Sequence, residues 1–353
     1  MSGTAGPDGS ATVADPSEAG TVYGRGFFGT LGDGGLRLDP YEAVYLAEMG
    51  RLAIEDGRGR SVEWPELFRR ATRHASGFGV RYLVYRDLRQ RGYVVRASPP
   101  PASFAVLPRG GILHKTPARF WVQPYSERAP FDLAELFDLA DRAQGAKKAL
   151  LLGLVDEESD LTYYRVRRPT PKGTLEARPL AAPAEGWLSE DRVVVFDAAA
   201  AEALGGALAY GSRIGDRVEL SLIEAAYLVE IGQLSLRDSR TRRGLAADAF
   251  LRRAERVDGR FRERLAAYRH LRDQSLAVKT GFKYGAHFRA YPRGPEHSHA
   301  RYLVQAVPDR HRSTWPEVAG DVRLAQGVRK ELLLGAVGAG DRVRFLSLER
   351  VRP

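Results

Sequence analysis

The apolar and polar positions predict the same series of elements twice along the chain. DPYEAVYLAEMG and SLIEAAYLVEIG each place apolar residues at helical spacing, behind Asp39 or Ser221, which can cap a first turn. Further amphipathic helices follow in WPELFRRATRHASGFGVRYLVYRDLRQRG and in AADAFLRRAERVDGRFRERLAAYRHLRDQ. We therefore expect each half of the chain to begin with a helical front section.

Short strand-like runs follow these helices in both halves. They are YVVRAS, FAVLP and RFWVQPY in the first half, and LAVKTG, FRAYP and RYLVQAVP in the second. A helix carrying AQGAKK or AQGVRK comes next, and then β-rich endings, LLLGLV with LTYYRVRR and LLLGAV with RVRFLSLERV. Strands mixed with a helix predict an α/β (α+β) fold, in which each repeat adds a mixed-sheet back section to its helical front section.

The matching motifs indicate an internal duplication. Glu42 pairs with Glu224 and Lys148 with Lys330 at one offset of 182 positions (224 − 42 and 330 − 148). FAVLPRG matches FRAYPRG at an offset of 184 (288 − 104), so the loops around this motif differ slightly in length. A repeat at a fixed offset sets the domain organisation. We expect a flexible tail at 1–20, a first front and back section at 21–98 and 99–167, a linker at 168–188, and a second front and back section at 189–275 and 276–353.

Composition narrows the class of protein. The chain has 353 residues, of which 44% are hydrophobic, so it can bury packed cores, and it has no cysteine, which excludes disulfides, thiolate metal sites and cysteine nucleophiles. No run approaches the roughly 20 apolar residues of a membrane span, and the start does not resemble a signal peptide, so we expect a cytoplasmic protein without a membrane partner. The net charge of +10 favours an anionic partner, of which nucleic acid is the commonest.

Three side chains in the second half form a set suited to acid–base chemistry without a metal or other cofactor. Tyr291, His299 and Lys330 lie on three separate short elements, with no acidic cluster among them. RNA carries its own nucleophile, the 2′-OH, so its cleavage needs a base, an acid and a cation for the charged transition state. Leu107 and Pro117 occupy the positions of Tyr291 and His299 in the first half, and neither can carry a proton. The second half is therefore predicted to react and the first to be silent.

Two alternatives stay open at this point. His297 is a rival to His299 as the acid, because HSH offers two imidazoles, and Lys330 could be an ordinary solvated lysine, because Lys148 is retained in the silent half. Tyrosine, with a reference pKa of about 10, also needs a nearby positive charge to act as a base. Lys330 is the expected source of that charge.

KTGFKYGAHFRAY, HARYLV and VRLAQGVRK resemble, in order and spacing, the core motifs of the archaeal tRNA-splicing endonuclease (tRNA-intron endonuclease), in its homodimeric form with a fused, duplicated subunit. The resemblance implies that Tyr291 is the general base, His299 the general acid and Lys330 the stabiliser of the transition state. It implies a degenerate endonuclease-like domain at 99–167 and a catalytic one at 276–353. The substrate would be precursor tRNA, cut at a bulge-helix-bulge to leave 2′,3′-cyclic phosphate and 5′-OH ends.

The resemblance also implies contacts with RNA and with a second copy of the chain. Two arginines would clamp a bulged base; Arg323 fits one, and Arg350 fits the other less well, so that Arg344 and Arg352 remain open. An acidic loop of the silent repeat would bind a basic cleft of the partner subunit in the homodimer, although a solvated hairpin tip is the ordinary interpretation of such a run. The loop residues are Asp156, Glu157, Glu158 and Asp160.

Two other classes of function compete with this interpretation. A catalytically silent RNA-binding or scaffold subunit would be expected to lack the three side chains, and this chain lacks them in its first half alone. A metal-dependent DNA junction nuclease would need paired carboxylates beside a lysine to hold Mg²⁺. Glu296, Glu317 and Asp321 do not form that pattern, and cleavage in EDTA would separate the two mechanisms.

Overall fold

The computed structural model describes residues 1–176 and 178–353 and divides into two compact units. One unit comprises Met1–Pro130, Asp138–Val166 and Arg350–Pro353, and the other Phe131–Phe137 and Arg167–Glu349. Each unit contains a front section and a back section, so the chain is a mixed α/β protein built from a tandem repeat. Within the described part, no helix is both long enough and apolar enough to cross a membrane.

The front section of the first unit is a small sheet packed with helices. Its five strands have the order β3-β4-β2-β1-β5. Helices are confirmed where the periodicity predicts them, and the front section also contains a sheet that the sequence pattern did not predict. The elements are β1 (Ser2–Ala5), β2 (Ala11–Val13), α1 (Pro16–Gly24), β3 (Thr30–Gly32), β4 (Gly35–Leu38), α2 (Pro40–Glu48), β5 (Ala53–Glu55), α3 (Trp64–His74) and α4 (Phe78–Gln90).

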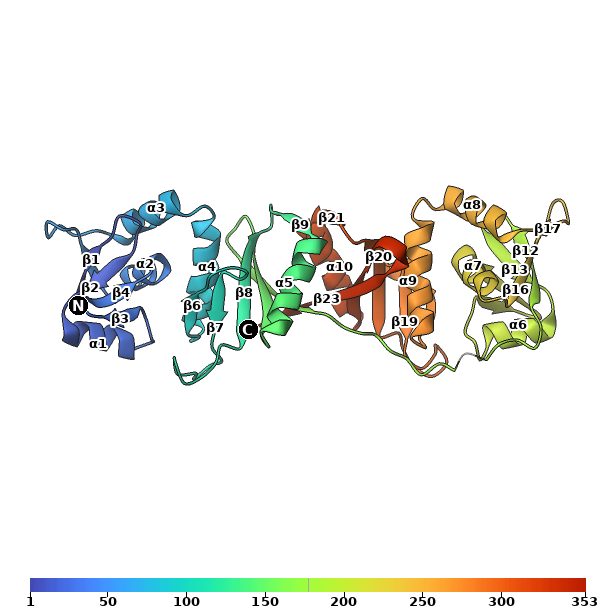
Figure 1. The fold of residues 1–353 in the computed structure, drawn as a ribbon, viewed down its shortest axis with the longest axis horizontal. Coiled ribbons are helices and arrows are strands. Elements are labelled where there is room, and N and C mark those ends of the chain that lie inside the picture. The colour runs from blue at the N-terminus through green and yellow to red at the C-terminus, as the bar shows by residue number, and fades with distance from the viewer. Residues whose placement is uncertain (177) are drawn as a thin grey trace. The chain divides into compact units, whose positions relative to one another are not determined.

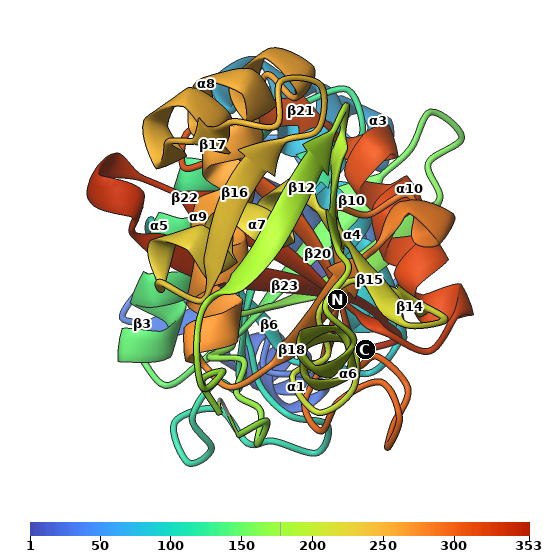
Figure 2. The same cartoon turned by 90° about the vertical axis from the view of Figure 1, so that its right-hand side faces the viewer.

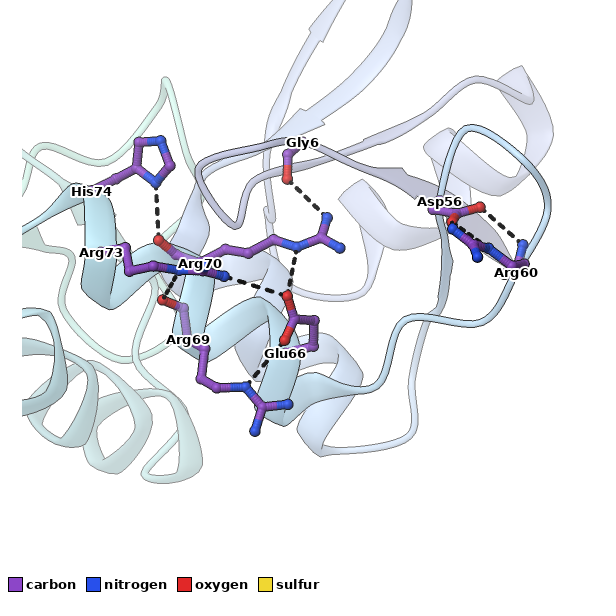
Figure 3. A network of polar contacts seen from close by, with 8 residues as sticks. All are labelled: Gly6, Asp56, Arg60, Glu66, Arg69, Arg70, Arg73 and His74. Atoms are coloured by element: carbon purple, nitrogen blue, oxygen red, sulfur yellow. Dashed lines mark hydrogen bonds and ion pairs between the residues drawn. The ribbon is translucent and has the colours of Figure 1, made fainter.

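The first 20 residues are ordered, which corrects the expectation of a flexible tail. Strand β1 pairs in parallel with β5, and Val13 of β2 is fully buried. The β1–β2 turn rests on α3, where Arg70 donates a hydrogen bond to the Gly6 carbonyl at 3.4 Å (Figure 3). The composition of the segment did not predict an ordered structure, because the residues that bury it lie far away in the sequence.

The outer face of α3 carries a network of charges. Glu66 binds the guanidinium groups of Arg69, Arg70 and Arg73 at 3.1, 3.2 and 3.5 Å (Figure 3). Exposed ion pairs of this kind each contribute little to stability. One carboxylate is surrounded by three cations, so this face retains a local excess of positive charge.

The front section of the second unit repeats the plan with a six-stranded sheet of order β14-β15-β13-β12-β16-β17. Strands β12 and β16 run side by side in parallel, as Figure 2 shows. In both units the second helix begins at a capping box, on Asp39 for α2 and on Ser221 for α7. The elements are β12 (Ala184–Ser189), β13 (Arg192–Val195), α6 (Ala198–Gly205), β14 (Ser212–Ile214), β15 (Arg217–Ser221), α7 (Leu222–Glu230), β16 (Leu234–Asp238), β17 (Gly244–Leu245), α8 (Ala247–Val257) and α9 (Phe261–Asp273).

The back sections share one strand order, β6-β7-β8-β10-β11 in the first repeat and β18-β19-β20-β22-β23 in the second. In the second unit α9 and α10 lie on opposite sides of this sheet (Figure 1). The first-repeat elements are β6 (Val95–Ala97), β7 (Phe104–Val106), β8 (Phe120–Ser126), β9 (Pro130–Asp132), α5 (Leu133–Gly145), β10 (Ala149–Val155) and β11 (Leu161–Arg167). The second-repeat elements are β18 (Ala277–Thr280), η1 (Phe282–Tyr284), β19 (Phe288–Tyr291), β20 (Tyr302–Pro308), β21 (Arg312–Thr314), α10 (Trp315–Gly327), β22 (Glu331–Val337), η2 (Ala339–Asp341) and β23 (Val343–Val351).

The strand registers confirm the alignment of the two copies. Phe104 pairs with Val122 as Phe288 pairs with Val304, and β10 follows β8 with the same register that β22 has on β20. Leu107 is therefore the structural counterpart of Tyr291. The equal offset of 182 between β8 and β20, and between β10 and β22, likewise matches Pro117 with His299 and Lys148 with Lys330.

The paired acids Glu42 and Glu224 have a structural role. Each closes a capping box, and Glu42 also accepts hydrogen bonds from the Gly29 amide at 2.9 Å and from Arg96 of β6 at 2.7 Å. Burial raises the pKa of Glu42 to about 7. Glu224 accepts from the Gly211 amide at 2.7 Å. These contacts hold the helix start in place, and in the first unit they join the front section to the back section.

Candidate active site

The strand register brings the backbone positions of the three predicted catalytic residues to one end of the second-repeat sheet. Tyr291 ends β19, His299 lies in the loop that leads into β20, and Lys330 directly precedes β22. Because β19 is antiparallel and β22 parallel to β20, the end of the first strand meets the starts of the other two. Neighbouring strands are about 4.8 Å apart, so the three backbone positions lie close together.

The turn that ends α10 fixes the backbone of Lys330. Arg329 has a positive φ of 55°, and the Lys330 amide donates to the Ala325 carbonyl at 2.8 Å. The first repeat has the same turn, with Lys147 at φ 56° and a hydrogen bond from the Lys148 amide to the Ala143 carbonyl at 2.8 Å. A left-handed residue in this position ends the helix sharply and aims the next residue along the following strand.

The two equivalent lysine side chains nevertheless have different surroundings. Lys148 Nζ donates to the carbonyl of Ala118, in the loop before β8, at 2.5 Å, and so binds one strand entry to another. Lys330 Nζ lies 5.3 Å from the centre of the Tyr284 ring and donates to the Val328 carbonyl at 3.2 Å. The first lysine therefore links two strand entries by a hydrogen bond, whereas the second holds its ammonium group at an aromatic face in the second repeat.

Tyr291 is nearly buried, with 6% of its surface exposed, and packs with Ala209, Ala277 and Ala300. The cation beside its ring is Arg289, whose guanidinium lies 5.9 Å from the ring centre. Arg289 and Tyr291 lie two residues apart on one strand, so both project from the same face of the sheet. That Lys330 also supplies charge to Tyr291 stays a prediction.

The predicted linker at 168–188 runs along the strand end that carries Tyr291. The Gly173 amide donates to the Gln274 carbonyl at 2.9 Å, and the Thr174 amide to the Pro292 carbonyl at 2.7 Å. Leu175 packs against the Tyr291 cluster. Ala177, which falls within the same predicted linker, lies outside the described residues, and the segment ends in strand β12. This part of the chain therefore helps to hold the tyrosine.

His299 and its rival His297 are both exposed in the loop from Pro292 to Arg301. The His297 amide donates to the Gly294 carbonyl at 3.3 Å, and Ser298 Oγ donates to the same oxygen at 3.3 Å. These bonds close a short turn that carries both imidazoles. The geometry brings this loop to the site but does not separate the two histidines.

A shallow depression of about 260 Å³ lies beside Lys330. Arg301 and Arg329 add two further cationic side chains to its wall, and Glu349, which pairs with Arg167 at 2.8 Å, forms part of its rim. With Arg167, the lining holds four cationic side chains against the carboxylates of Glu331 and Glu349, and this net positive charge suits a phosphate group. The sequence pattern did not indicate a role for Arg301, although this residue lies within HARYLV. It also did not indicate Tyr284 and Arg289, because their involvement depends on the direction of their side chains.

The other predicted site residues are placed as follows. Arg323 is exposed on α10, and Arg344 lies 4.4 Å from the centre of the Phe137 ring. Arg350 and Arg352 belong to the last few residues, which cluster with the first unit. Asp156, Glu157, Glu158 and Asp160 are all exposed at the tip of the β10–β11 hairpin. Residues 1–176 and 178–353 contain no group of three or more metal-ligating side chains placed to hold an ion.

Fold and site together define a duplicated α/β protein whose second half carries a tyrosine, a histidine and a set of cations at one sheet end. Residues 78–163 and 261–345 match the model of the tRNA intron endonuclease catalytic C-terminal domain, and residues 7–68 and 184–251 match that of its N-terminal domain. The tRNA-splicing endonuclease of Methanosarcina mazei is 37% identical over 348 residues, covering 98% of this chain and 97% of that protein. The tRNA-splicing endonuclease of Natronomonas pharaonis is 36% identical over 350 residues, covering 94% of each.

The chain therefore belongs to the tRNA intron endonuclease family, in its archaeal-type form with both domains duplicated. It is an enzyme of tRNA splicing that excises introns from precursor tRNA. The predicted resemblance to this family, with a duplicated chain, is thus confirmed, together with the α/β fold class.

Proposed function

We propose that the chain cleaves the two bulges of a bulge-helix-bulge in precursor tRNA by metal-independent transesterification, with Tyr291, His299 and Lys330 as its catalytic residues. The observation that supports this most strongly is the convergence of these three positions at one end of neighbouring strands. Lys330 also lines a depression with a net positive lining, which suits the phosphate of an RNA strand.

Each residue has one role in the proposed reaction. Tyr291 takes the proton of the 2′-OH, whose oxygen attacks the adjacent phosphorus. His299 gives a proton to the departing 5′-oxygen, so the products are a 2′,3′-cyclic phosphate and a 5′-OH. Lys330 stabilises the negative charge that the phosphate develops. The proton-transfer groups each contribute about 10²–10⁴ in rate, and an oriented cation adds a comparable factor.

Arg289 is proposed as a positioning residue for the base. Its guanidinium lies 5.9 Å from the Tyr291 ring centre, on the same face of β19, so it can hold the ring in position. Arg323 and Arg350 are proposed to hold a bulged base between their guanidinium planes, with Arg344 and Arg352 as alternatives for the second position. Arg344 already contacts Phe137, so that ring would have to release it first.

The active form is proposed to be an isologous homodimer, with one reacting site in each chain. Two sites related by a two-fold axis would match the two bulges of the substrate. The acidic tip of the silent repeat, residues 156–160, is proposed as the group that binds a basic surface of the partner.

The test is cleavage of a bulge-helix-bulge RNA by the purified protein in EDTA. We expect two cuts with cyclic phosphate ends, and no cut where the 2′-OH of the scissile nucleotide is replaced by hydrogen. His299→Ala should lower the single-turnover rate by about 10²-fold or more. His297→Ala is the matched control, since both imidazoles are exposed in one loop, and it should leave the rate unchanged. A strict requirement for Mg²⁺, or loss of activity in the His297 variant instead, would refute the assignment.

A further inference from the structure

The turn between β18 and β19 presents an aromatic ring to solvent. Phe282, the first residue of η1, is 85% exposed, so neither hydrophobic core of its unit uses it. A rigid turn holds it there: a Cβ on Gly281 would lie 2.6 Å from the Ala286 carbonyl oxygen, and Gly285 has a positive φ of 61°. A large apolar side chain that stays exposed does not contribute the free energy that its burial would give. A phenylalanine held exposed by a rigid turn therefore indicates a binding partner.

Tyr284, the last residue of η1, connects this turn to the proposed active site. The Tyr284 ring lies 5.3 Å from Lys330 Nζ and 5.7 Å from the guanidinium of Arg289. Gln305 of β20 donates to the Gly285 carbonyl at 2.9 Å, which fixes the turn to the sheet. The exposed ring is therefore held only two residues along the same turn from the aromatic face that contacts the catalytic lysine.

The silent repeat closes the same hairpin without an aromatic residue. Its β6–β7 connection, residues 98–103, reads SPPPAS and is closed by a hydrogen bond from the Ser98 amide to the Ser103 carbonyl at 3.0 Å. The reacting repeat has GFKYGAH at residues 281–287. An exposed ring is thus not needed to connect these strands, and it occurs in the repeat that carries the proposed catalytic groups.

We propose that Phe282 is a positioning residue that stacks on an unpaired nucleobase of the RNA substrate, beside the nucleotide whose phosphate meets Lys330. Aromatic faces stack on any base and so suit a substrate whose bulge sequences vary. Lys283, exposed next to it, can contact the backbone phosphate. The stack would hold the splayed strand so that the 2′-OH and the leaving oxygen are in line. This inference rests on the proposed site at Lys330.

The test uses the full chain and an uncleavable bulge-helix-bulge RNA, with a 2′-deoxy nucleotide at each scissile position and 2-aminopurine in the bulge. Phe282→Ala should weaken binding about tenfold and abolish the stacking quench of 2-aminopurine fluorescence. Phe282→Trp should retain both, and Phe282→Leu should resemble the alanine variant. The matched control is Phe196→Ala, because Phe196 is also exposed, at 61%, but lies in the front section. With cleavable RNA, the single-turnover rates should follow the same order.

Three results would overturn the inference. Unchanged binding and quench in Phe282→Ala would show that no base stacks there. Full rescue by leucine would indicate an apolar contact rather than an aromatic one. Altered sedimentation of Phe282→Ala without RNA would make the ring a contact between protein chains. Because the fluorescence readout needs no cleavage, failure of the proposed chemistry would be distinguishable from failure of the stack.

Discussion

At the scale of single residues, equivalent positions in the two copies have different contacts and are predicted to have different roles. Lys330→Ala should lower the single-turnover cleavage rate by about 10²-fold, because it removes the cation at the developing charge. Lys148→Ala should leave the rate almost unchanged and cost about 1 kcal/mol of stability, because it removes the hydrogen bond to the Ala118 carbonyl. Rate measurements and urea unfolding of both variants check this. Equal loss of activity in the two variants would contradict a silent first half.

His287 predicts a pH dependence of stability. Burial, aided by the charges of Arg264 and Arg260, lowers the pKa of this histidine to about 4, and its Nδ1 accepts a hydrogen bond from the Ala306 amide at 3.0 Å. In the unfolded chain the pKa is about 6.5, so between pH 6.5 and 4 the unfolded state binds the extra proton. The contribution of neutral His287 is therefore complete above pH 6.5 and is lost as the pH falls towards 4.

The measurement is the free energy of unfolding from pH 4 to 8 for the wild type and for His287→Gln. The variant should lose less stability than the wild type on acidification, because glutamine does not titrate. Other acid-sensitive groups are common to both proteins, so the difference between the curves isolates His287. Parallel curves would show that the histidine is not held neutral.

The sequence was enough to place Tyr291, His299 and Lys330 on separate elements, because their motifs carry the strand and helix boundaries with them. It could not show that Arg289 lies beside the Tyr291 ring, since that depends on which face of β19 the two side chains share. Nor could it separate the roles of Lys330 and Lys148, which share a backbone turn and differ in side-chain direction.

At the scale of elements, predictability follows length and periodicity. Helices α3, α4, α8 and α9 run for 11 or 13 residues with a clear apolar face, and the pattern predicts them. Strands such as β2 and β3 have three residues each, too few to show alternation. Their existence depends on pairing with distant segments, as β1 pairs with β5, and no local pattern reports that.

The linker beside Tyr291 carries a prediction at this scale. A Cβ on Gly173 would lie 2.1 Å from the Ser275 carbonyl oxygen, so Gly173→Ala must displace the segment that packs on the tyrosine cluster. We expect the single-turnover rate to fall several-fold while RNA binding is retained, because the base is misplaced and the RNA surface is untouched. Gly259→Ala is the control, since nothing lies within 4 Å of its added Cβ. A normal rate in Gly173→Ala would show that the linker does not position Tyr291.

At the scale of the whole molecule, the duplication accounts for the fold and for the proposed division of labour. Equal strand orders and registers show that the two repeats share one architecture. Leucine and proline at the positions of the proposed base and acid would remove chemistry without removing packing, since Leu107 is 3% exposed. The hairpin tips differ as well, with DEESD at residues 156–160 and GAGD at 338–341. If the first repeat does not catalyse, its hairpin tip is free to differ in charge and to serve in the proposed dimer contact.

The acidic tip therefore leads to the last prediction, which concerns the proposed dimer. Asp156 accepts hydrogen bonds from the Glu158 and Asp160 amides at 3.0 and 2.8 Å, so replacing it would disturb the turn itself, and Glu157 pairs with Arg128 of its own chain. The sharper test is Glu158→Gln combined with Asp160→Asn, which removes two exposed charges and keeps the turn.

If these two carboxylates bind a basic surface of a partner chain, their loss should weaken the dimer and lower cleavage together, and added salt should weaken the wild-type dimer by screening. Asp33→Asn with Glu55→Gln removes the same charge from exposed positions elsewhere in the first unit and should change neither property. Sedimentation at micromolar concentration, with single-turnover cleavage of the same samples, measures both. A Glu158 and Asp160 double variant that stays fully dimeric and fully active would make the loop an ordinary solvated hairpin tip.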